Sequence, residues 1–300
     1  MAAIQDASTP SLTFLLYSAY IFLVLFSCFP EKIQALESHS DTSNSTSVCT
    51  TPSIADSLRN LDSLRESLAR QEDSVIFCLI ERSKYPMNSQ LYEKKKAKPS
   101  DSLFESFVKE SESVQAKAGR YRFEEENSFY PNSPPPTQPP LNCTPVLHGP
   151  RALFNINANI STMYVKTLLP LIAAKGDDGN YAPTAVSDLL CLQVLSRRIH
   201  YGKFVAEAKF ISAPQNYTRA IKAEDKDALT RFLTVRSLED VIKKRVERKA
   251  TIFGQDVDNQ EGIKTKYKVK PSVVSSLYND WVIPLTKSVE VEYLLQRLDS

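Results

Sequence analysis

Two cations interrupt an otherwise apolar helical stripe in the segment from Cys191 to Phe210. Arg198 and Lys209 are eleven positions apart, and at about 100° per residue an α-helix returns over that distance to within about 20° of its starting direction. Both side chains therefore leave one helix face, with Val205 between them. Because an unpaired cation is costly to remove from water, this face requires a carboxylate, either from the protein or from a ligand.

The same pattern of a charge on an apolar helical stripe recurs elsewhere in the chain. Arg65 lies on a leucine stripe near the start of the predicted fold, and Glu239 on a stripe with Ile242. Thr286 and Glu290 share a stripe near the C-terminus. We therefore expect three cations and two carboxyl groups to point inward. Two acids do not neutralise three bases, so the set predicts an anionic ligand; a purely structural ion-pair network is the alternative.

Helical periodicity extends through most of the chain. Only seven glycines occur in 300 residues, none of them before Gly119, which suits a helical protein. The periodic segments predict helices at 54–82, 101–118, 155–173, 184–211, 225–250 and 271–298. Residues 131–150 hold eight prolines, which exclude a regular helix and predict a long surface connection. The expected fold class is all-α, with one multi-helix bundle domain over residues 53–300.

Composition and motif spacing exclude several functions. The formal net charge of +2 favours neither nucleic acid nor an acidic membrane as a partner. The sequence has no glycine-rich phosphate loop and no Cys/His cluster with metal-ligand spacing, so we expect no cofactor and no metal. We expect the basic run from Lys243 to Lys249 to be solvated surface, and His200 to be a structural histidine.

The N-terminal region has the pattern of a targeting signal. Residues 12–29 are apolar or small without a charge, which predicts a secretory signal over residues 1–30, followed by a flexible Ser/Thr-rich tail over 31–52. The first ten residues contain Asp6 and no Lys or Arg, so an uncleaved membrane anchor is an alternative to cleavage. We therefore expect a secreted protein, with the plastid or the cytosol as the alternative location.

In a secreted protein, sequons can be glycosylated and cysteines can form disulfide bridges. Four sequons begin at Asn44, Asn142, Asn159 and Asn216. A bridge between Cys49 and Cys143 is one outcome in an oxidising compartment. The apolar helical positions of Cys78 and Cys191 predict buried thiols without a chemical role.

Several long blocks together resemble one family. They are 64–77 (LRESLARQEDSVIF), 80–83 (IERS), 176–181 (GDDGNY), 196–210 (SRRIHYGKFVAEAKF) and 283–295 (IPLTKSVEVEYLL). In order and spacing they resemble the all-helical chorismate mutases of plants and fungi, from about residue 53 to the C-terminus. The resemblance implies a homodimer with each active site built within one chain, and rearrangement of chorismate to prephenate without metal or cofactor, in aromatic amino-acid biosynthesis or a secreted variant of it.

The resemblance also implies roles for the inward-facing residues. Arg65 and Arg198 match the family's carboxylate clamps, and Thr286 helps to hold a carboxylate. Lys209 reaches a carboxylate and the ether oxygen of chorismate, and Glu290, when protonated, donates to the same oxygen. Glu239 accepts the ring hydroxyl. Most plant relatives carry Gln where Glu290 stands, so this position is of the fungal type.

A second departure concerns regulation. Regulated members of the family bind tyrosine or tryptophan at an interface site that includes a Gly-Ser pair, whereas this chain has Ala182 and Pro183 there. Arg120 and Asn180 match other positions of that site. We therefore expect weak or absent feedback control. Two other functions stay open: an inactive secreted helical binding protein, and a mutase that uses isochorismate.

Overall fold

A computed structural model of the chain describes residues 58, 60–94, 101–139, 145–148, 154–256 and 266–298. All of them belong to one compact unit, Ser47–Ser300. The predicted signal and Ser/Thr-rich tail, the sequons at Asn44 and Asn142, and Cys49 and Cys143 lie outside the described residues.

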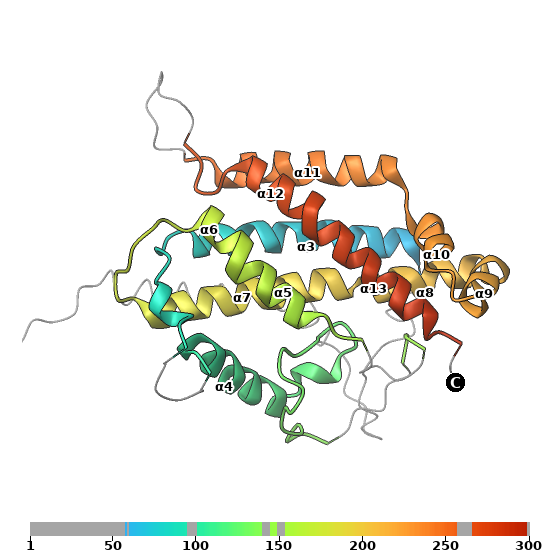
Figure 1. The fold of residues 1–300 in the computed structure, drawn as a ribbon, viewed down its shortest axis with the longest axis horizontal. Helices are drawn as coiled ribbons and strands as arrows, with labels where there is room; N and C mark the ends of the chain where they lie inside the picture. The colour runs from blue at the N-terminus through green and yellow to red at the C-terminus, as the bar shows by residue number, and fades with distance from the viewer. Residues whose placement is uncertain are drawn as a thin grey trace, which may run out of the picture. The chain divides into compact units, whose positions relative to one another are not determined.

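The described residues form helices and one isolated β-bridge, between Gln255 and Tyr267, so the all-α prediction is confirmed (Figure 1). The α-helices are α3 (Leu61–Arg82), α4 (Leu103–Lys117), α5 (Asn157–Met163), α6 (Leu169–Ile172), α7 (Tyr181–His200), α8 (Gly202–Ser212), α9 (Pro214–Lys222), α10 (Lys226–Leu233), α11 (Arg236–Gly254), α12 (Pro271–Leu277) and α13 (Ile283–Leu295). No helix in these ranges is long and apolar enough to cross a membrane.

Local sequence sets where the first two long helices begin. The side chain of Asn60 accepts hydrogen bonds from the backbone N–H groups of Asp62 and Ser63, at 2.9 and 3.1 Å, and so caps α3. Ser102 and Glu105 form a reciprocal capping box at the start of α4. Such caps each stabilise a helix by about 1 kcal/mol. The cap at Asn60 places Arg65 in the second turn of α3.

Two of the predicted helices contain a π-helical turn just before a proline. The turns are Tyr164–Leu168, ahead of Pro170, and Tyr278–Val282, ahead of Pro284. A proline inside a helix lacks an N–H group and collides with the carbonyl four residues earlier, so a wider turn relieves the collision. The second turn leads directly into α13, which carries Thr286 and Glu290.

The predicted helix over 225–250 is wrong as a single element. Thr234 and Val235 adopt extended backbone conformations, with ψ angles of 120° and 91°, and separate α10 from α11. β-Branched residues favour extended backbone, which accounts for the break. Helical spacing places Phe232 and Val235 on one stripe with Glu239, yet each is 47% exposed. Helix α9 is a further element that the periodic segments did not predict.

The core consists of two apolar clusters. One is centred on the C-terminal half of α3 with α7 and α12, and the other on α8, α9, α10 and α13. In Figure 1, α3 and α7 run alongside each other while α13 crosses them obliquely, and α3 packs on α7 as α13 packs on α8. Residues of both clusters line the cavity described below.

Two buried polar residues outside that cavity, Arg82 and His200, have hydrogen-bond partners. The guanidinium of Arg82 donates to Asp188 at 2.5 Å, and the Tyr164 hydroxyl donates to the same carboxylate at 2.6 Å, which ties α3 to α7. His200 Nε2 accepts from the backbone N–H of Ile156 at 3.1 Å, and Nδ1 lies 2.9 Å from the Ser196 carbonyl oxygen. Burial lowers the pKa of His200 to about 3. The prediction of a structural histidine is confirmed, and Cys78 and Cys191 are buried as expected.

Candidate active site

A cavity of about 220 Å³ lies among α3, the junction of α7 and α8, the junction of α10 and α11, and α13. Its wall contains all the residues that the sequence analysis assigned to substrate: Arg65, Arg198, Lys209, Glu239, Thr286 and Glu290. Apolar side chains such as Leu68, Val205, Ile242 and Ile283 form much of the remainder. An apolar wall with a few convergent polar groups is the usual construction of a small-molecule site.

Arg198 is the cation held deepest in this wall. It lies near the C-terminal end of α7 and is 3% exposed. Its Nε and Nη1 atoms are buried and have no hydrogen-bond partner among the described residues. Its guanidinium carbon lies 5.7 Å from the centre of the Tyr278 ring. A buried guanidinium with unpartnered donors is expensive, so it is suited to receive an anion from outside the protein.

Lys209 and Glu290 stand opposite each other across α8 and α13. Lys209 Nζ donates to the carbonyl oxygen of Leu233 at 3.0 Å and lies 3.6 Å from Glu290 Oε2. That oxygen is buried and accepts no hydrogen bond from any part of the chain that the structure describes. Burial raises the pKa of the Glu290 carboxyl above its ordinary value, although Lys209, Arg198 and Lys287 act in the opposite direction. Glu290 therefore keeps its proton to a higher pH than an exposed glutamate does.

Thr286 and Glu239 occupy other parts of the wall. The Thr286 hydroxyl donates to the carbonyl oxygen of Val282 at 2.6 Å, at the end of the π-helical turn. Glu239, one turn into α11, lies 2.7 Å from Lys287 Nζ. Glu239 and Ile242 both line the cavity, as their shared stripe on the helix predicted.

Arg65 does not point inward as predicted. Its side chain is 56% exposed, and Nη1 donates to Asp62 at 2.8 Å. Asp62 lies one helical turn earlier, so the two charges pair in solvent at little desolvation cost. Arg65 therefore lies at the rim of the cavity, and it has to leave Asp62 before it can hold a ligand inside.

The wall also contains a buried ion pair that the sequence did not predict, between Glu72 and Arg245. Glu72, which is fully buried, accepts from Arg245 at 2.5 and 2.8 Å and lies 3.2 Å from Lys249 Nζ. Both Glu72 and Arg245 line the cavity. The prediction that the run Lys243–Lys249 is solvated is therefore wrong for Arg245 and Lys249, because a buried carboxylate draws them in. The signal was present, since Glu72 follows Leu68 by four residues on the leucine stripe.

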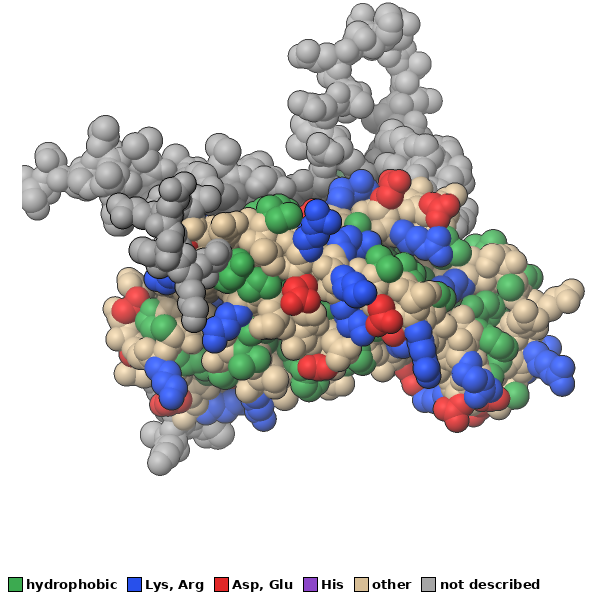
Figure 2. All heavy atoms as spheres, turned by 90° about the horizontal axis from the view of Figure 1, so that it is seen from above, with side chains coloured by type: hydrophobic (Ala, Val, Ile, Leu, Met, Phe, Trp, Pro, Cys, Tyr) green, Lys and Arg blue, Asp and Glu red, His purple; other side chains and the backbone are tan. Residues whose placement is uncertain are grey.

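The surface around α11 carries charges of both signs. On the face that Figure 2 shows, Lys and Arg side chains are interspersed with Asp and Glu side chains. Lys243 pairs there with Asp240 at 2.7 Å. This face is therefore not a single basic field of the kind that binds nucleic acid.

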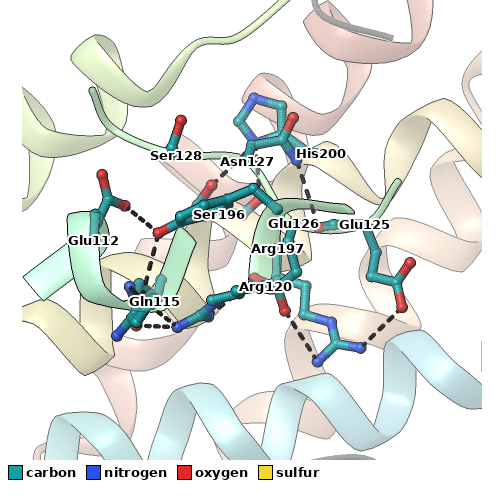
Figure 3. A network of polar contacts seen from close by, with 12 residues as sticks. Glu112, Gln115, Arg120, Glu125, Glu126, Asn127, Ser128, Ser196, Arg197 and His200 are labelled. Carbon is teal, nitrogen blue, oxygen red and sulfur yellow. Dashed lines mark hydrogen bonds and ion pairs between the residues drawn. The ribbon is translucent and has the colours of Figure 1, made fainter. Parts of the chain in front are cut away.

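The residues matched to a regulatory site lie apart within one chain. Arg120 is held by Glu126, at 2.9 and 3.0 Å, and by the side-chain oxygens of Gln115 and Gln193, at 3.0 and 2.6 Å (Figure 3). Gln193 is ten residues along α7 from Pro183, about 15 Å at the rise of an α-helix. Asn180 instead donates to Asp178 at 2.9 Å, and Ala182 is exposed.

The fold and the cavity define a class of protein: an all-helical bundle with a small interior site whose wall contains more cationic than acidic side chains. In comparisons with known proteins, the chain is 53% identical over 248 residues to chorismate mutase 2 of Arabidopsis thaliana, covering 80% of this chain and 94% of that one. It is 49% identical to the chloroplastic chorismate mutase 1 of the same species, covering 80% and 74% of the two chains, and 49% identical to the cytosolic chorismate mutase 2 of Zea mays, covering 80% and 96%. The chain belongs to the eukaryotic all-helical chorismate mutase family. No family model matches it.

Solved structures agree with this membership. The chorismate mutase of Candida albicans in complex with L-Trp superimposes with a TM-score of 0.78 at 35% identity, covering 82% of this chain and 94% of that one. The structure of AtCM1 with tyrosine bound in its allosteric site gives a TM-score of 0.72 at 50% identity, covering 80% and 97%. The helical arrangement of this chain is therefore the arrangement of the family.

Proposed function

We propose that this protein is a chorismate mutase that rearranges chorismate to prephenate in the cavity between α3, α8, α11 and α13. The observation that carries the proposal is the buried guanidinium of Arg198, whose Nε and Nη1 have no hydrogen-bond partner among the described residues, in one wall with Lys209 and Glu290. Chorismate has two carboxylates, a hydroxyl and an ether oxygen, so it offers acceptors to each of these donors. The reaction is inferred from family membership, and the groups that we assign to it are the side chains of the cavity wall.

The rearrangement is concerted: a C–O ether bond breaks as a C–C bond forms, and no proton or covalent intermediate is exchanged with the protein. Negative charge develops on the ether oxygen in the transition state. Lys209 and a protonated Glu290 are both able to donate to that oxygen, and fixed donors in a buried site stabilise developing charge strongly. The cavity also holds the substrate in its compact reactive conformation, which lowers the entropic part of the barrier.

We assign binding of the substrate in its ground state to the other residues of the wall. The planar fork of Arg198 suits a bidentate contact with one carboxylate, and Thr286, which lines the same cavity, would assist. Arg65 would exchange Asp62 for a substrate carboxylate and so close the rim. Glu239, already oriented by Lys287 at 2.7 Å, would accept the ring hydroxyl.

A direct assay tests this function and its alternatives. Purified protein should convert chorismate to prephenate with no added cofactor. A folded sample that leaves chorismate unchanged would contradict the proposal and favour an inactive binding protein. Turnover of isochorismate in place of chorismate would move the assignment to the other mutase.

Assembly and location are part of the proposal. We infer a homodimer, which sedimentation of the purified protein tests. The uncharged block over residues 12–29 argues for the secretory route, whereas relatives are named as cytosolic or chloroplastic. A C-terminal fluorescent fusion separates these locations. Loss of an endoglycosidase-sensitive mass shift in Asn44→Gln would support secretion.

A further inference from the structure

A glycine of α8 packs directly against α13. Gly202 is the first residue of α8. A Cβ atom at this position would lie 3.0 Å from Thr286 Cγ2, 3.0 Å from the Thr286 carbonyl oxygen and 3.2 Å from Glu290 Cγ. All three distances are shorter than ordinary van der Waals contact, and both facing residues line the cavity.

The groups that face Gly202 cannot easily move aside. The hydroxyl of Thr286 donates to the Val282 carbonyl at 2.6 Å, which fixes the rotamer that directs Cγ2 toward Gly202. The Thr286 carbonyl oxygen belongs to the backbone of α13. A methyl group at position 202 would therefore displace α13 itself, and with it the carboxyl group of Glu290.

Backbone conformation does not require glycine here. Gly202 is helical, unlike Gly119, Gly176 and Gly179, which have positive φ angles. Glycine is less favourable than alanine inside a helix, so its presence at position 202 calls for a reason other than φ. The space between α8 and α13 is that reason.

We infer that Gly202 is a positioning residue for the rearrangement: by lacking a side chain, it lets α8 approach α13 closely enough to set Glu290 and Thr286 against Lys209. The inference rests on the proposed function. It assigns to Gly202 no contact with substrate. Its effect passes through Glu290, whose Oε2 lies 3.6 Å from Lys209 Nζ, and through Thr286.

The test is Gly202→Ala in the full chain, with Gly254→Ala as the matched control. Gly254 ends α11, and a Cβ there would come no closer than 3.5 Å to any atom, which is ordinary contact. We expect Gly202→Ala to lower kcat by about tenfold or more, since displacing reacting groups by less than an ångström has effects of this order. KM should change much less, because the donor at the ether oxygen acts mainly in the transition state. Gly254→Ala should keep the parental kcat and KM.

A second substitution separates positioning from general damage. Thr286→Ser removes Cγ2 and keeps the hydroxyl, so the double variant Gly202→Ala/Thr286→Ser should recover part of the kcat lost in Gly202→Ala. The double variant also serves as the test if Gly202→Ala alone does not fold, in which case it should be folded and active. No recovery in the double variant, or parental kcat in Gly202→Ala, would overturn the inference while an active parental protein upholds the proposed function. A parental protein that leaves chorismate unchanged would overturn both.

Discussion

Lys209 Nζ and Glu290 Oε2 lie 3.6 Å apart in the cavity wall, too far for a hydrogen bond, and the glutamate oxygen has no other partner in the described part of the chain. The ammonium group of Lys209 donates one hydrogen bond to the Leu233 carbonyl, at 3.0 Å, and has two further N–H donors. An oxygen atom of a ligand placed between the two side chains would receive a donor from each. This is the arrangement that a developing negative charge requires.

The first prediction concerns pH. Glu290 donates only when protonated, and burial raises its pKa, so the protonated form persists above the range of an ordinary glutamate. We expect kcat/KM to be level at low pH and to fall by about tenfold per pH unit once pH exceeds the raised pKa. A pH profile of kcat/KM on the parental protein measures the position of this fall.

Glu290→Gln is the matched variant, because the amide keeps a donor at every pH. Its profile should lack the alkaline fall and exceed the parental activity at the alkaline end. Two superimposable profiles would show that Glu290 is not the titrating donor.

The second prediction concerns Arg198. Arg198→Met should cost about 3 kcal/mol or more in transition-state stabilisation, the loss typical of one preorganised donor in a dry site. The same change should raise the free energy of unfolding without substrate by about 1 kcal/mol, because it removes a buried cation whose Nε and Nη1 have no hydrogen-bond partner among the described residues. Steady-state kinetics and urea unfolding measure the two effects. A variant that loses both activity and stability would mean that Arg198 is structural.

The third prediction concerns Glu72 and Arg245. Arg245→Met should lower the free energy of unfolding by about 2 kcal/mol, since it removes two short hydrogen bonds from a fully buried carboxylate. In the double variant Glu72→Met/Arg245→Met much of the lost stability should be recovered, because neither charge of the pair is left and Lys249 still pairs with Asp73 at 2.7 Å. Urea unfolding of both single variants and the double variant completes the cycle. Additive losses would show that the two residues act independently.

Sequence alone identified the helical class and the wall of the site. Charges on apolar helical stripes predicted Arg198, Lys209 and Glu290 in the cavity wall, because helix periodicity fixes which side chains share a face. The single helix expected over 184–211 is wrong, since Arg198 lies in α7 and Lys209 in α8. Whether a side chain at the edge of that face turns inward is a different matter. Arg65 pairs with Asp62 in solvent, and that choice depends on the cost of burial rather than on periodicity.

Contacts between helices also could not be predicted from the sequence. The Glu72–Arg245 pair and the contact of Gly202 with α13 both depend on which helices meet, and a local pattern does not contain that information. In the sequence, nothing distinguishes Gly202 from the other residues of the predicted helix. Its constraint appears only when Thr286 and Glu290 are placed opposite it.

The fourth prediction concerns regulation. Arg120 is already satisfied by Glu126, Gln115 and Gln193, and position 183 is a proline, which offers neither a backbone donor nor a hydroxyl. We therefore expect tyrosine and tryptophan at sub-millimolar concentration to change the activity by well under the roughly fivefold lower end of typical allosteric coupling. Ala182→Gly/Pro183→Ser restores the pair found in regulated relatives, and it should gain a response to at least one of the two amino acids. Initial rates with and without each amino acid, on both proteins, provide the measurement. Strong opposing effects on the parental protein would contradict the prediction, because binding would then proceed without the groups that positions 182 and 183 lack.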